Sequence, residues 1–319
     1  MLALLTPPAL DPADSVPVLE PERAEPGYWT GCPSIRYDGD RFLLTYRQRR
    51  PRGADPERGW RCAIAESTDG IHFTDIWSVR SDQLGTPSME RLSLARHDSG
   101  DWLLYLSYVD PTDNRWRIDV LRASAPDGFH LSRRIGVLTA ASTGTEGIKD
   151  PYTVRIGGGI LLYAVASRRR AFTPAEAARA HATADIHTTG LTTQPTVAAI
   201  SQDGTAFEYL GEVLPTGNGW DGYETRLCCV LPTDGSYVAL YDGSASHREN
   251  YEERCGVAVS TDLLHWLRTT PSGPRYVSPH GTGSLRYCDA VAVGESRYLY
   301  FEQARADGAH ELRLARIPR

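Results

Sequence analysis

Three carboxylates stand in short charged runs and could carry acid/base chemistry. Glu90, Asp150 and Glu224 each have a basic residue beside them or two positions away. Three acids that converge on one site can divide the work of cleaving a glycosidic bond. One stays ionised so that it can activate water or attack carbon. A second is held protonated so that it can donate a proton to the leaving oxygen. The third orients the second and tunes its pKa.

The same runs also have a purely structural explanation. Buried charges are costly unless they are compensated, so any polar channel needs paired acids and bases. A non-catalytic sugar-binding protein would show such a set as well. The recurrence of the pairs is better evidence than any single acid. Further residues of these runs are expected to bind substrate: Cys32, Arg91, Lys149, Tyr223, Arg226, Arg286, Tyr287 and Asp289.

The elements that carry these runs repeat along the chain. A short apolar strand, a Ser, an Asp-Gly or close variant and an aromatic residue occur in this order four times, at 62–73, 120–129, 197–207 and 257–266. Asp-Gly between strand-like runs is typical of a hairpin, because Gly tolerates the positive φ of a tight turn. An aromatic-rich strand precedes each copy and occurs five times, at 42–46, 102–105, 160–163, 237–241 and 298–301.

Each aromatic strand follows a turn, and another strand lies before that turn. The unit is therefore three or four antiparallel strands in about 60 residues. The prediction is an all-β fold, a five-bladed β-propeller with four-stranded antiparallel blades in one domain, 1–319. A β-sandwich and a two-domain β protein are the rivals. After an N-terminal segment, 1–27, the expected blades are 28–80, 81–138, 139–215, 216–272 and 273–319.

Two segments fall outside this regular pattern. The last unit reaches the end of the sequence with three strands, and residues 16–19 could supply its fourth strand and close the ring. Residues 174–181 have the one clear helical pattern and indicate an insertion helix or lid in the third unit. In a propeller the first strand of each blade lines the central channel, and the charged runs lie on those strands.

The run from Cys32 to Tyr46 resembles the first-blade motif of the five-bladed propeller glycosidases. This superfamily includes glycoside hydrolase families 43, 32, 68 and 130, with arabinanases and xylosidases, invertases and levansucrases, and mannoside phosphorylases. Residues 148–151, Ile-Lys-Asp-Pro, resemble its Arg-Asp-Pro or Lys-Asp motif, and the Ser-x-Asp-Gly turns resemble its turns across four blades. The resemblance implies a nucleophile or base, an orienting Asp and an acid Glu on successive blades.

The sequence departs from that pattern at Cys32, where the first-blade motif usually carries Asp before Pro-Ser. Two registers follow. If the triad has moved one blade along, Glu90 is the base or nucleophile, Asp150 the orienting acid and Glu224 the proton donor. If it has not moved, Cys32 replaces the essential acid and the chemistry is altered. Lys149-Asp150-Pro is followed one blade later by Glu224, as the orienting Asp is followed by the acid Glu in the superfamily. This order favours the first register.

Three functions stay open on this basis. The favoured one is hydrolysis of a small glycoside, and the cations beside the acids suggest an anionic group on that substrate. A glycoside phosphorylase is the second, with the Arg168–Arg170 cluster available for phosphate. The third is a degenerate or repurposed propeller, either a sugar binder or a biosynthetic enzyme with other chemistry.

Composition limits the partners. Forty acidic residues against 34 basic ones give a net charge of −6, which excludes a general nucleic-acid binder. No apolar run is long enough for a membrane span, and the N-terminus lacks the basic region of a signal peptide. Six cysteines without CxxC spacing and nine scattered histidines indicate a cytoplasmic protein with no metal or cofactor. The basic residues are 33 Arg and one Lys, and that single Lys149 lies beside Asp150.

Overall fold

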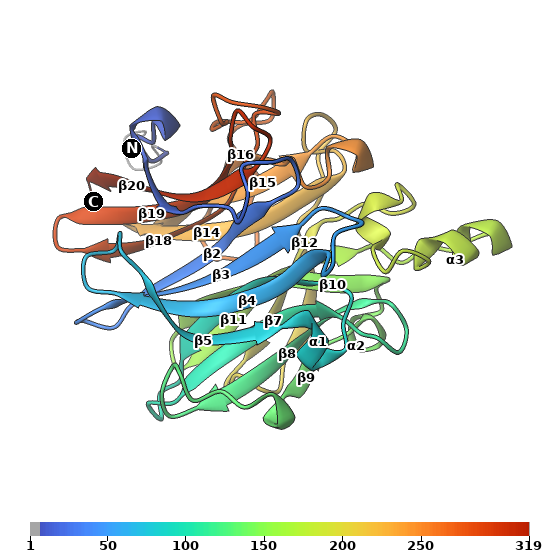
Figure 1. Ribbon diagram of the computed structural model, residues 1–319, viewed down its shortest axis with the longest axis horizontal. Coiled ribbons are helices and arrows are strands. Elements are labelled where there is room, and N and C mark those ends of the chain that lie inside the picture. The colour runs from blue at the N-terminus through green and yellow to red at the C-terminus, as the bar shows by residue number, and fades with distance from the viewer. Residues whose placement is uncertain (1–6, 319) are drawn as a thin grey trace.

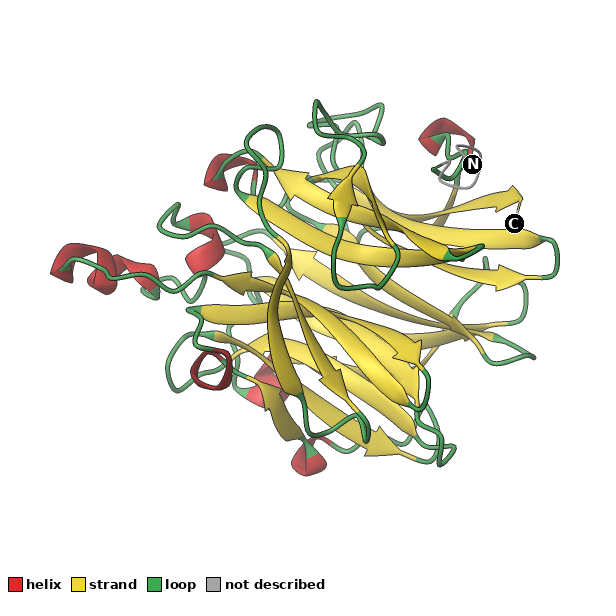
Figure 2. Ribbon diagram, turned by 180° about the vertical axis from the view of Figure 1, so that it is seen from behind, coloured by secondary structure: helices red, strands yellow, loops and turns green. Residues whose placement is uncertain are grey.

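The computed structural model describes residues 7–318, which form an all-β structure of four sheets. Figures 1 and 2 show the sheets arranged side by side, with little helix between them. Residues 1–6, on which part of the expectation about the N-terminus rests, lie outside the described part of the chain. Among residues 7–318, no helix is long and apolar enough to span a bilayer.

Three of the sheets have four antiparallel strands in chain order. The first comprises β6 (Met89–Arg96), β7 (Trp102–Val109), β8 (Trp116–Ala123) and β9 (Ile135–Leu138). The second comprises β10 (Gly147–Ile156), β11 (Gly159–Ser167), β12 (Thr196–Ser201) and β13 (Glu208–Leu214). The third comprises β14 (Glu224–Thr233), β15 (Ser236–Ser244), β16 (Arg254–Ser260) and β17 (Leu267–Arg268).

The fourth sheet has eight strands and joins the two ends of the chain. It contains β2 (Trp29–Tyr37), β3 (Phe42–Arg50), β4 (Arg58–Ser67), β5 (Thr74–Arg80), β18 (Leu285–Val293), β19 (Ser296–Ala304) and β20 (His310–Pro318). β20 meets β2 through a single parallel bridge between His310 and Trp29. β1 (Val16–Leu19) pairs antiparallel with β20, which confirms the predicted pairing of residues 16–19 beside the last strands.

The first strands of the repeats contact one another in a closed cycle. β2 contacts β6, β6 contacts β10, β10 contacts β14, β14 contacts β18, and β18 contacts β2. Four apolar clusters lie between neighbouring sheets, so each sheet is buried on the faces that meet its neighbours. A fifth cluster lies between the two ends of the chain within the eight-stranded sheet. This arrangement is consistent with a propeller in which the first strands line the centre.

The repeated turns and the repeated aromatic strands hold neighbouring repeats together. In the turns at Asp69, Asp203 and Asp262, the Ser two residues earlier donates to the Asp carboxylate at 2.8–3.1 Å. A tyrosine hydroxyl from another repeat donates to a backbone carbonyl of each turn, at 2.6–2.9 Å. The same tyrosine packs edge-to-face on the aromatic residue that ends the turn motif. These tyrosine-to-turn contacts are Tyr300 to Gly70, Tyr105 to Gly204 and Tyr163 to Leu263.

The helices are short and lie in the connections. They are η2 (Pro12–Asp14), α1 (Ser81–Leu84), η3 (Leu131–Arg133), α2 (Ala140–Thr143), α3 (Pro174–Ala180), η4 (Ile186–Thr188) and η5 (His247–Glu249). α3 confirms the predicted helix, and it begins with Pro174 after a capping box between Thr173 and Glu176. It belongs to residues 168–195, between β11 and β12, which we call the insertion. Figure 1 shows α3 projecting away from the sheets.

Candidate active site

Each first strand is interrupted by a bulge close to its charged run. The pairing register shifts at Cys32–Pro33 in β2, at Glu90–Arg91 in β6, at Asp150–Pro151 in β10, at Cys228 in β14 and at Tyr287–Cys288 in β18. Cys32, Asp150 and Tyr287 have positive φ of 54°, 59° and 53°. A bulge re-aims side chains, which is why bulges occur beside functional sites. Glu90 and Asp150 therefore share a repeat position, whereas Glu224 does not, because the bulge of β14 comes at Cys228.

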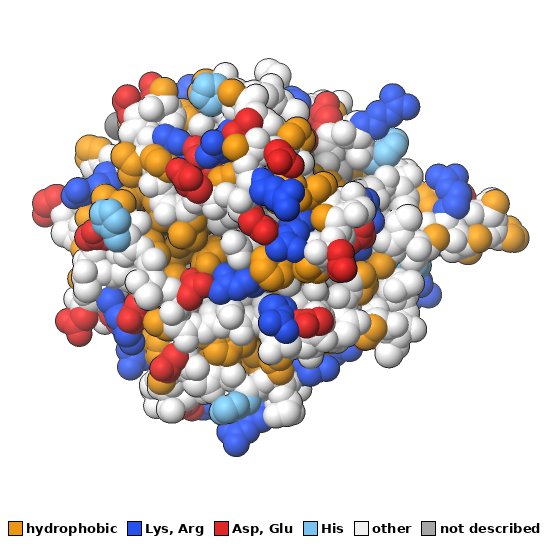
Figure 3. Space-filling model, in the orientation of Figure 1, with side chains coloured by type: hydrophobic (Ala, Val, Ile, Leu, Met, Phe, Trp, Pro, Cys, Tyr) orange, Lys and Arg blue, Asp and Glu red, His pale blue; other side chains and the backbone are white. Residues whose placement is uncertain are grey.

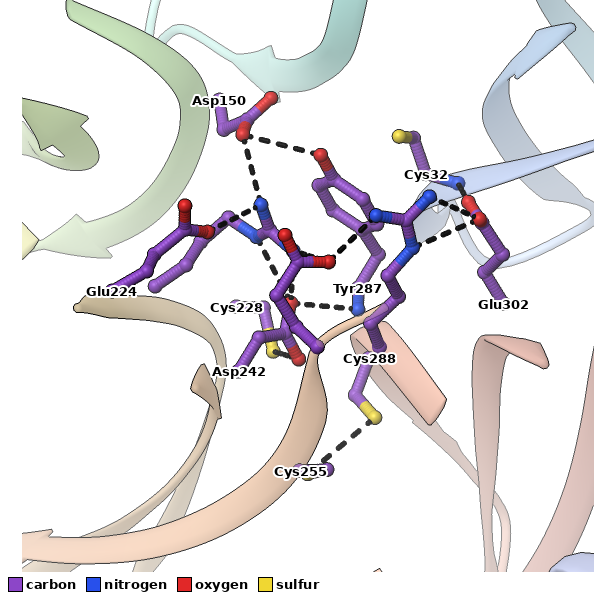
Figure 4. A network of polar contacts seen from close by, with 12 residues as sticks. Cys32, Asp150, Glu224, Cys228, Asp242, Cys255, Tyr287, Cys288 and Glu302 are labelled. Carbon is purple, nitrogen blue, oxygen red and sulfur yellow. Dashed lines mark hydrogen bonds and ion pairs between the residues drawn. The ribbon is translucent and has the colours of Figure 1, made fainter. Parts of the chain in front are cut away.

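Asp150 and Glu224 meet at one guanidinium group. Nη1 of Arg226 donates to Oδ2 of Asp150 at 3.2 Å and to Oε1 of Glu224 at 2.8 Å. The two carboxylates are thus within one hydrogen bond of the same nitrogen atom, as Figure 4 shows. The hydroxyl of Tyr287 donates to the same oxygen of Asp150 at 3.2 Å. Two of the three predicted acids are therefore brought together from β10 and β14.

The ionisation of Asp150 is set by its neighbours. Burial alone would raise the pKa of this carboxyl, but the charges of Lys149 and Arg226 hold it well below its usual range. The backbone N–H of Arg91 also donates to Oδ1 at 3.3 Å. Asp150 is therefore ionised at neutral pH, as an orienting carboxylate must be.

Arg226 binds two further carboxylates behind this pair. Its Nε donates to Asp242 at 2.9 Å, and its Nη2 lies 3.4 Å from Glu253. The guanidinium group lies 3.7 Å over the ring of Tyr287. Burial raises the pKa of Asp242 to about 6, although Arg226 opposes this. One buried cation thus compensates several acids at the centre of the molecule.

Glu90 approaches from β6 and is fixed by arginines of β3. It forms an ion pair with Arg47, and its Oε1 lies 3.4 Å from Nη1 of Arg49. Sγ of Cys32 lies 3.8 Å from Oε2 of the same carboxylate. Burial raises the pKa of the Cys32 thiol, so this residue is a neutral thiol beside the Glu90 carboxylate.

Lys149 connects the three predicted acids. Its Nζ lies 3.6 Å from Asp150, and its ammonium lies 5.3 Å over the ring of Trp116. Burial would lower the pKa of Lys149, but Asp150, Glu90 and Glu224 together raise it above its ordinary value. Glu90 therefore shares the electrostatic surroundings of the other two acids, and the lone lysine of the chain lies among all three.

The other predicted binding residues divide into two groups. Arg286 and Tyr287 belong to the same polar network, since Arg286 contacts Glu302 and Glu253, both at 2.6 Å. Tyr223 directs its hydroxyl to the backbone carbonyl of His187 at 2.7 Å. Arg91 and Asp289 instead link strands. Arg91 donates to the carbonyls of Pro33 and Cys228 at 2.9 and 3.0 Å, and Asp289 accepts from the N–H of Ile35 at 2.9 Å.

Sequence reasoning missed the acids and bases of the second strands. Arg47 in β3, Asp242 in β15 and Glu302 in β19 are all buried in the network. Each follows directly after the aromatic run of its strand, at Tyr46, Tyr241 and Phe301. That shared position was a usable signal, because a charge next to a run of buried residues in a strand is itself expected to be buried with a partner.

The insertion adds two further residues that no pattern indicated. Asp185 is fully buried and lies 3.4 Å from Arg58 and 3.2 Å from Arg52. It also accepts a hydrogen bond from Tyr251. His187 is fully buried, and its Nδ1 lies 3.9 Å from Oε2 of Glu224. The insertion thus contributes to the wall of the candidate site.

The site is closed to solvent. Glu90, Asp150 and Glu224 each have 0% of their surface exposed. All six cysteines lie in the described residues and are free and buried. Within residues 7–318, no group of three or more His, Cys, Asp or Glu side chains is arranged to hold a metal ion. The side chains that meet at the site are carboxylates, cations and a histidine.

The comparisons place this geometry on a known fold. No family model matches the chain, and no curated protein matches its sequence. A thermostable family-43 glycoside hydrolase is 13% identical, with 90% of this chain and 89% of that one aligned at a TM-score of 0.64. A glycosyl hydrolase from Bacteroides ovatus is 16% identical over 95% and 92% of the two chains, with a TM-score of 0.61.

A β-1,2-mannobiose phosphorylase from Listeria innocua, solved with β-1,2-mannobiose, is 14% identical over 95% and 94% of the two chains, with a TM-score of 0.61. The resemblance to the propeller glycosidase superfamily is thus confirmed for the fold. Identities this low carry the fold alone, so the activity has to be argued from the site.

Proposed function

We propose that this chain is a glycoside hydrolase built as a single propeller of five four-stranded blades. The observation that carries the proposal is the meeting of Asp150 and Glu224 on one nitrogen of Arg226, with Glu90 and Lys149 in the same network. The closed cycle of five first strands supports the blade count. Carboxylates from successive blades that meet in the central channel are suited to acid/base cleavage of a glycoside.

Each acid has an environment that fits one role. Glu90, fixed by Arg47 and Arg49, serves as the base or nucleophile. Asp150, held ionised by Lys149 and Arg226, orients the proton donor. Glu224 is the donor: Arg226 occupies Oε1, while Oε2 has no hydrogen-bond partner among the described residues.

The position of Cys32 supports the register in which Glu90 replaces the first-blade acid. Cys32 and Asp150 share a bulge, a positive φ and a following proline, so they are equivalent residues of two blades. The carboxylate of Glu90 lies against Sγ of Cys32 at 3.8 Å. An acid from the second blade thus reaches the place where the first blade has a thiol.

Hydrolysis is favoured over phosphorolysis by the state of the arginine cluster. Arg168 forms two contacts with Glu212 at 2.7 and 2.5 Å, and Arg170 pairs with Glu176 at 2.5 Å. A phosphate would have to displace these carboxylates. The cations of the central network likewise face carboxylates already, so the site favours an uncharged sugar over the anionic one that the cations beside the acids suggested.

The test uses 4-nitrophenyl glycosides of arabinofuranose, xylopyranose, fructofuranose and mannopyranose, each with and without phosphate. We expect turnover of at least one without phosphate. Glu224→Gln should lower kcat by 100-fold or more while sugar binding by calorimetry persists. Glu212→Gln, on the surface, is the matched control. Turnover that requires phosphate would establish a phosphorylase, and an unchanged kcat in Glu224→Gln would remove the proposed donor.

A further inference from the structure

His187 enters the candidate site from the insertion and faces the proposed proton donor. It lies in η4 (Ile186–Thr188) and has 0% of its surface exposed. Its Nδ1 lies 3.9 Å from Oε2 of Glu224. Neither atom has a hydrogen-bond partner among the described residues, although both are buried. Two unpaired buried polar atoms that face each other need an explanation.

The hydrogen bonds around the other ring nitrogen fix the tautomer. Nε2 of Gln194 donates to the backbone carbonyl of Thr192 at 3.2 Å, and a carbonyl can only accept, so the other end of the amide, Oε1, is the acceptor. Oγ of Ser167 lies 2.6 Å from that Oε1 and must donate to it. Ser167 can therefore only accept from Nε2 of His187, which lies 3.4 Å away. A neutral His187 thus carries its proton on Nε2 and presents a lone pair at Nδ1.

That lone pair points at a carboxylate oxygen. Two acceptors repel each other in a buried site, unless one proton lies between them. Oε1 of Glu224 already accepts from Arg226 at 2.8 Å, so the free position for a proton is Oε2. The separation of 3.9 Å exceeds a hydrogen bond by about 1 Å, and catalytic contacts commonly shorten when substrate binds.

We propose that His187 and Glu224 share one proton, and that His187 is the positioning residue that keeps Glu224 protonated, so that Glu224 can act as the donor. The catalytic part of this inference rests on the proposed function. In hydrolysis, Glu224 gives its Oε2 proton to the leaving oxygen, and the attacking water gives one proton to Glu90. The cycle is complete when Glu90 has released that proton to solvent and Glu224 has taken up a new proton at Oε2, the oxygen that faces Nδ1 of His187.

The charges around His187 favour this arrangement. The titratable groups that face it are Lys149 and Asp150 of β10, Asp185 of the insertion, and Tyr223 and Glu224 at the start of β14. Burial and the charge of Lys149 lower the pKa of His187, while Glu224 and Asp185 oppose that lowering. The imidazole is thus held neutral, with its lone pair at Nδ1 facing Oε2 of Glu224.

The first experiment measures His187 directly, by ¹⁵N-histidine NMR of the full chain. We expect the Nε2–H tautomer at pH 7. If Glu224 carries the shared proton, Glu224→Gln replaces one neutral group by another, so the pKa of His187 should stay close to that of the wild type. His181, in the same insertion but 3.1 Å from Glu146, is the internal reference. An Nδ1–H tautomer, or a fall in the pKa of His187 in Glu224→Gln while that of His181 stays constant, would overturn the proposal, because it would show that Glu224 is an anion in the wild type.

The second experiment compares leaving groups. His187→Gln keeps a donor toward Ser167 but removes Nδ1. On a methyl glycoside, kcat should fall about 10- to 100-fold with KM nearly unchanged, and the alkaline limb of the pH profile should move, because that limb reports loss of the donor's proton. A 2,4-dinitrophenyl glycoside needs no proton from the donor and should keep its kcat. His181→Gln is the matched control.

The two proposals fail differently in this comparison. If Glu224→Gln leaves both glycosides unaffected, the proposed function is wrong. If Glu224→Gln impairs the methyl glycoside and His187→Gln does not, the shared proton alone is wrong. Should His187→Gln fail to fold, Ser167→Ala replaces it, and loss of the Nε2–H tautomer in the NMR spectrum is then the expected result. If no glycoside is turned over, the NMR experiment alone decides whether the proton is shared.

Discussion

Arg226 carries an unusual share of the electrostatic compensation at the residue scale. Four carboxylates lie within 3.4 Å of its guanidinium nitrogens: Asp150, Glu224, Asp242 and Glu253. All are buried, so none can be compensated by solvent. Removing one partner of a buried ion pair is far more costly than the pair is worth, because the other charge stays buried alone.

We therefore expect Arg226→Met to lower the free energy of unfolding by about 3–5 kcal/mol, measured by urea denaturation at pH 7. Arg168→Met is the control. Its guanidinium group is 39% exposed and pairs with Glu212, so its loss should cost below about 1 kcal/mol. Equal losses in the two variants would mean that the central network does not depend on Arg226.

Asp242 gives the network a measurable pH dependence. Its pKa is raised to about 6 by burial, so the folded state holds this proton in a pH range where the unfolded chain has released it. Stability from this group is present at low pH and is lost as pH rises toward 6. Between pH 5 and 7 that loss is roughly 1 kcal/mol.

Asp242→Asn removes this contribution. The free energy of unfolding of the variant minus that of the wild type should therefore be more positive at pH 7 than at pH 5, by roughly 1 kcal/mol. The comparison between the two pH values cancels the titration of other groups. A difference that is independent of pH, or of opposite sign, would show that Asp242 is ionised throughout this range.

At the scale of elements, the tyrosine-to-turn contacts explain why two motifs repeat together. The Ser-Asp turn closes its own hairpin, and the tyrosine of another repeat binds the carbonyl of that turn. Tyr105→Phe and Tyr163→Phe keep the aromatic packing and remove only the hydroxyl, which donates at 2.9 and 2.6 Å. Each should lower the free energy of unfolding by about 1 kcal/mol, since a buried carbonyl then loses its donor.

The double variant extends this prediction. The two tyrosines bind different turns, so the two losses should add within about 0.5 kcal/mol in urea denaturation. Tyr37→Phe is the control, because its hydroxyl donates to Gly39 in an exposed turn. Losses no larger than that of the control would mean that the turns are held by packing alone.

The strands and the inner position of Asp150 were predictable because their signals are local. Alternation, Asp-Gly turns and aromatic runs recur in short windows, and they gave the all-β class, the pairing of residues 16–19 and α3. The register of the bulges was not predictable, so the sequence does not show that Glu224 lies outside the repeat position that Glu90 and Asp150 share. A bulge depends on cross-strand pairing, which one sequence does not show.

The insertion was harder to predict for a related reason. Asp185 and His187 lie in a segment without strand or helix periodicity, and their partners Arg58 and Glu224 are distant in sequence. Only the fold brings them together. Arg47, Asp242 and Glu302 each follow an aromatic run, but they lie on the second strands of their repeats, whereas the charged runs that indicate the site lie on the first strands.

At the scale of the whole molecule, the candidate site is enclosed. On the face in Figure 3, basic and acidic side chains are interspersed and α3 projects from the edge. Because the three acids are fully buried, a sugar reaches them only if part of the wall moves. The insertion is the segment attached by polar contacts: Arg58 donates to the carbonyls of Thr183 and Ala184 at 3.4 and 3.1 Å.

Asp185 is the charged part of that attachment, so its replacement should open the site. Burial raises the pKa of Asp185, but Arg58 and Lys149 outweigh this and hold it below its ordinary value, so the residue is ionised. Asp185→Asn keeps the shape and removes the charge. Amide hydrogen exchange in residues 183–190 should then accelerate about tenfold, equivalent to about 1.4 kcal/mol of local stability, while β11 and β12 stay protected.

Glu176→Gln, which alters the cap of α3 in the same insertion, is the control for a general loosening of the segment. It should change exchange near α3 and leave 183–190 protected. If Asp185→Asn leaves 183–190 protected as well, Asp185 does not hold the wall and entry to the site needs another path. If exchange accelerates throughout β11 and β12, the residue supports the fold rather than a movable wall.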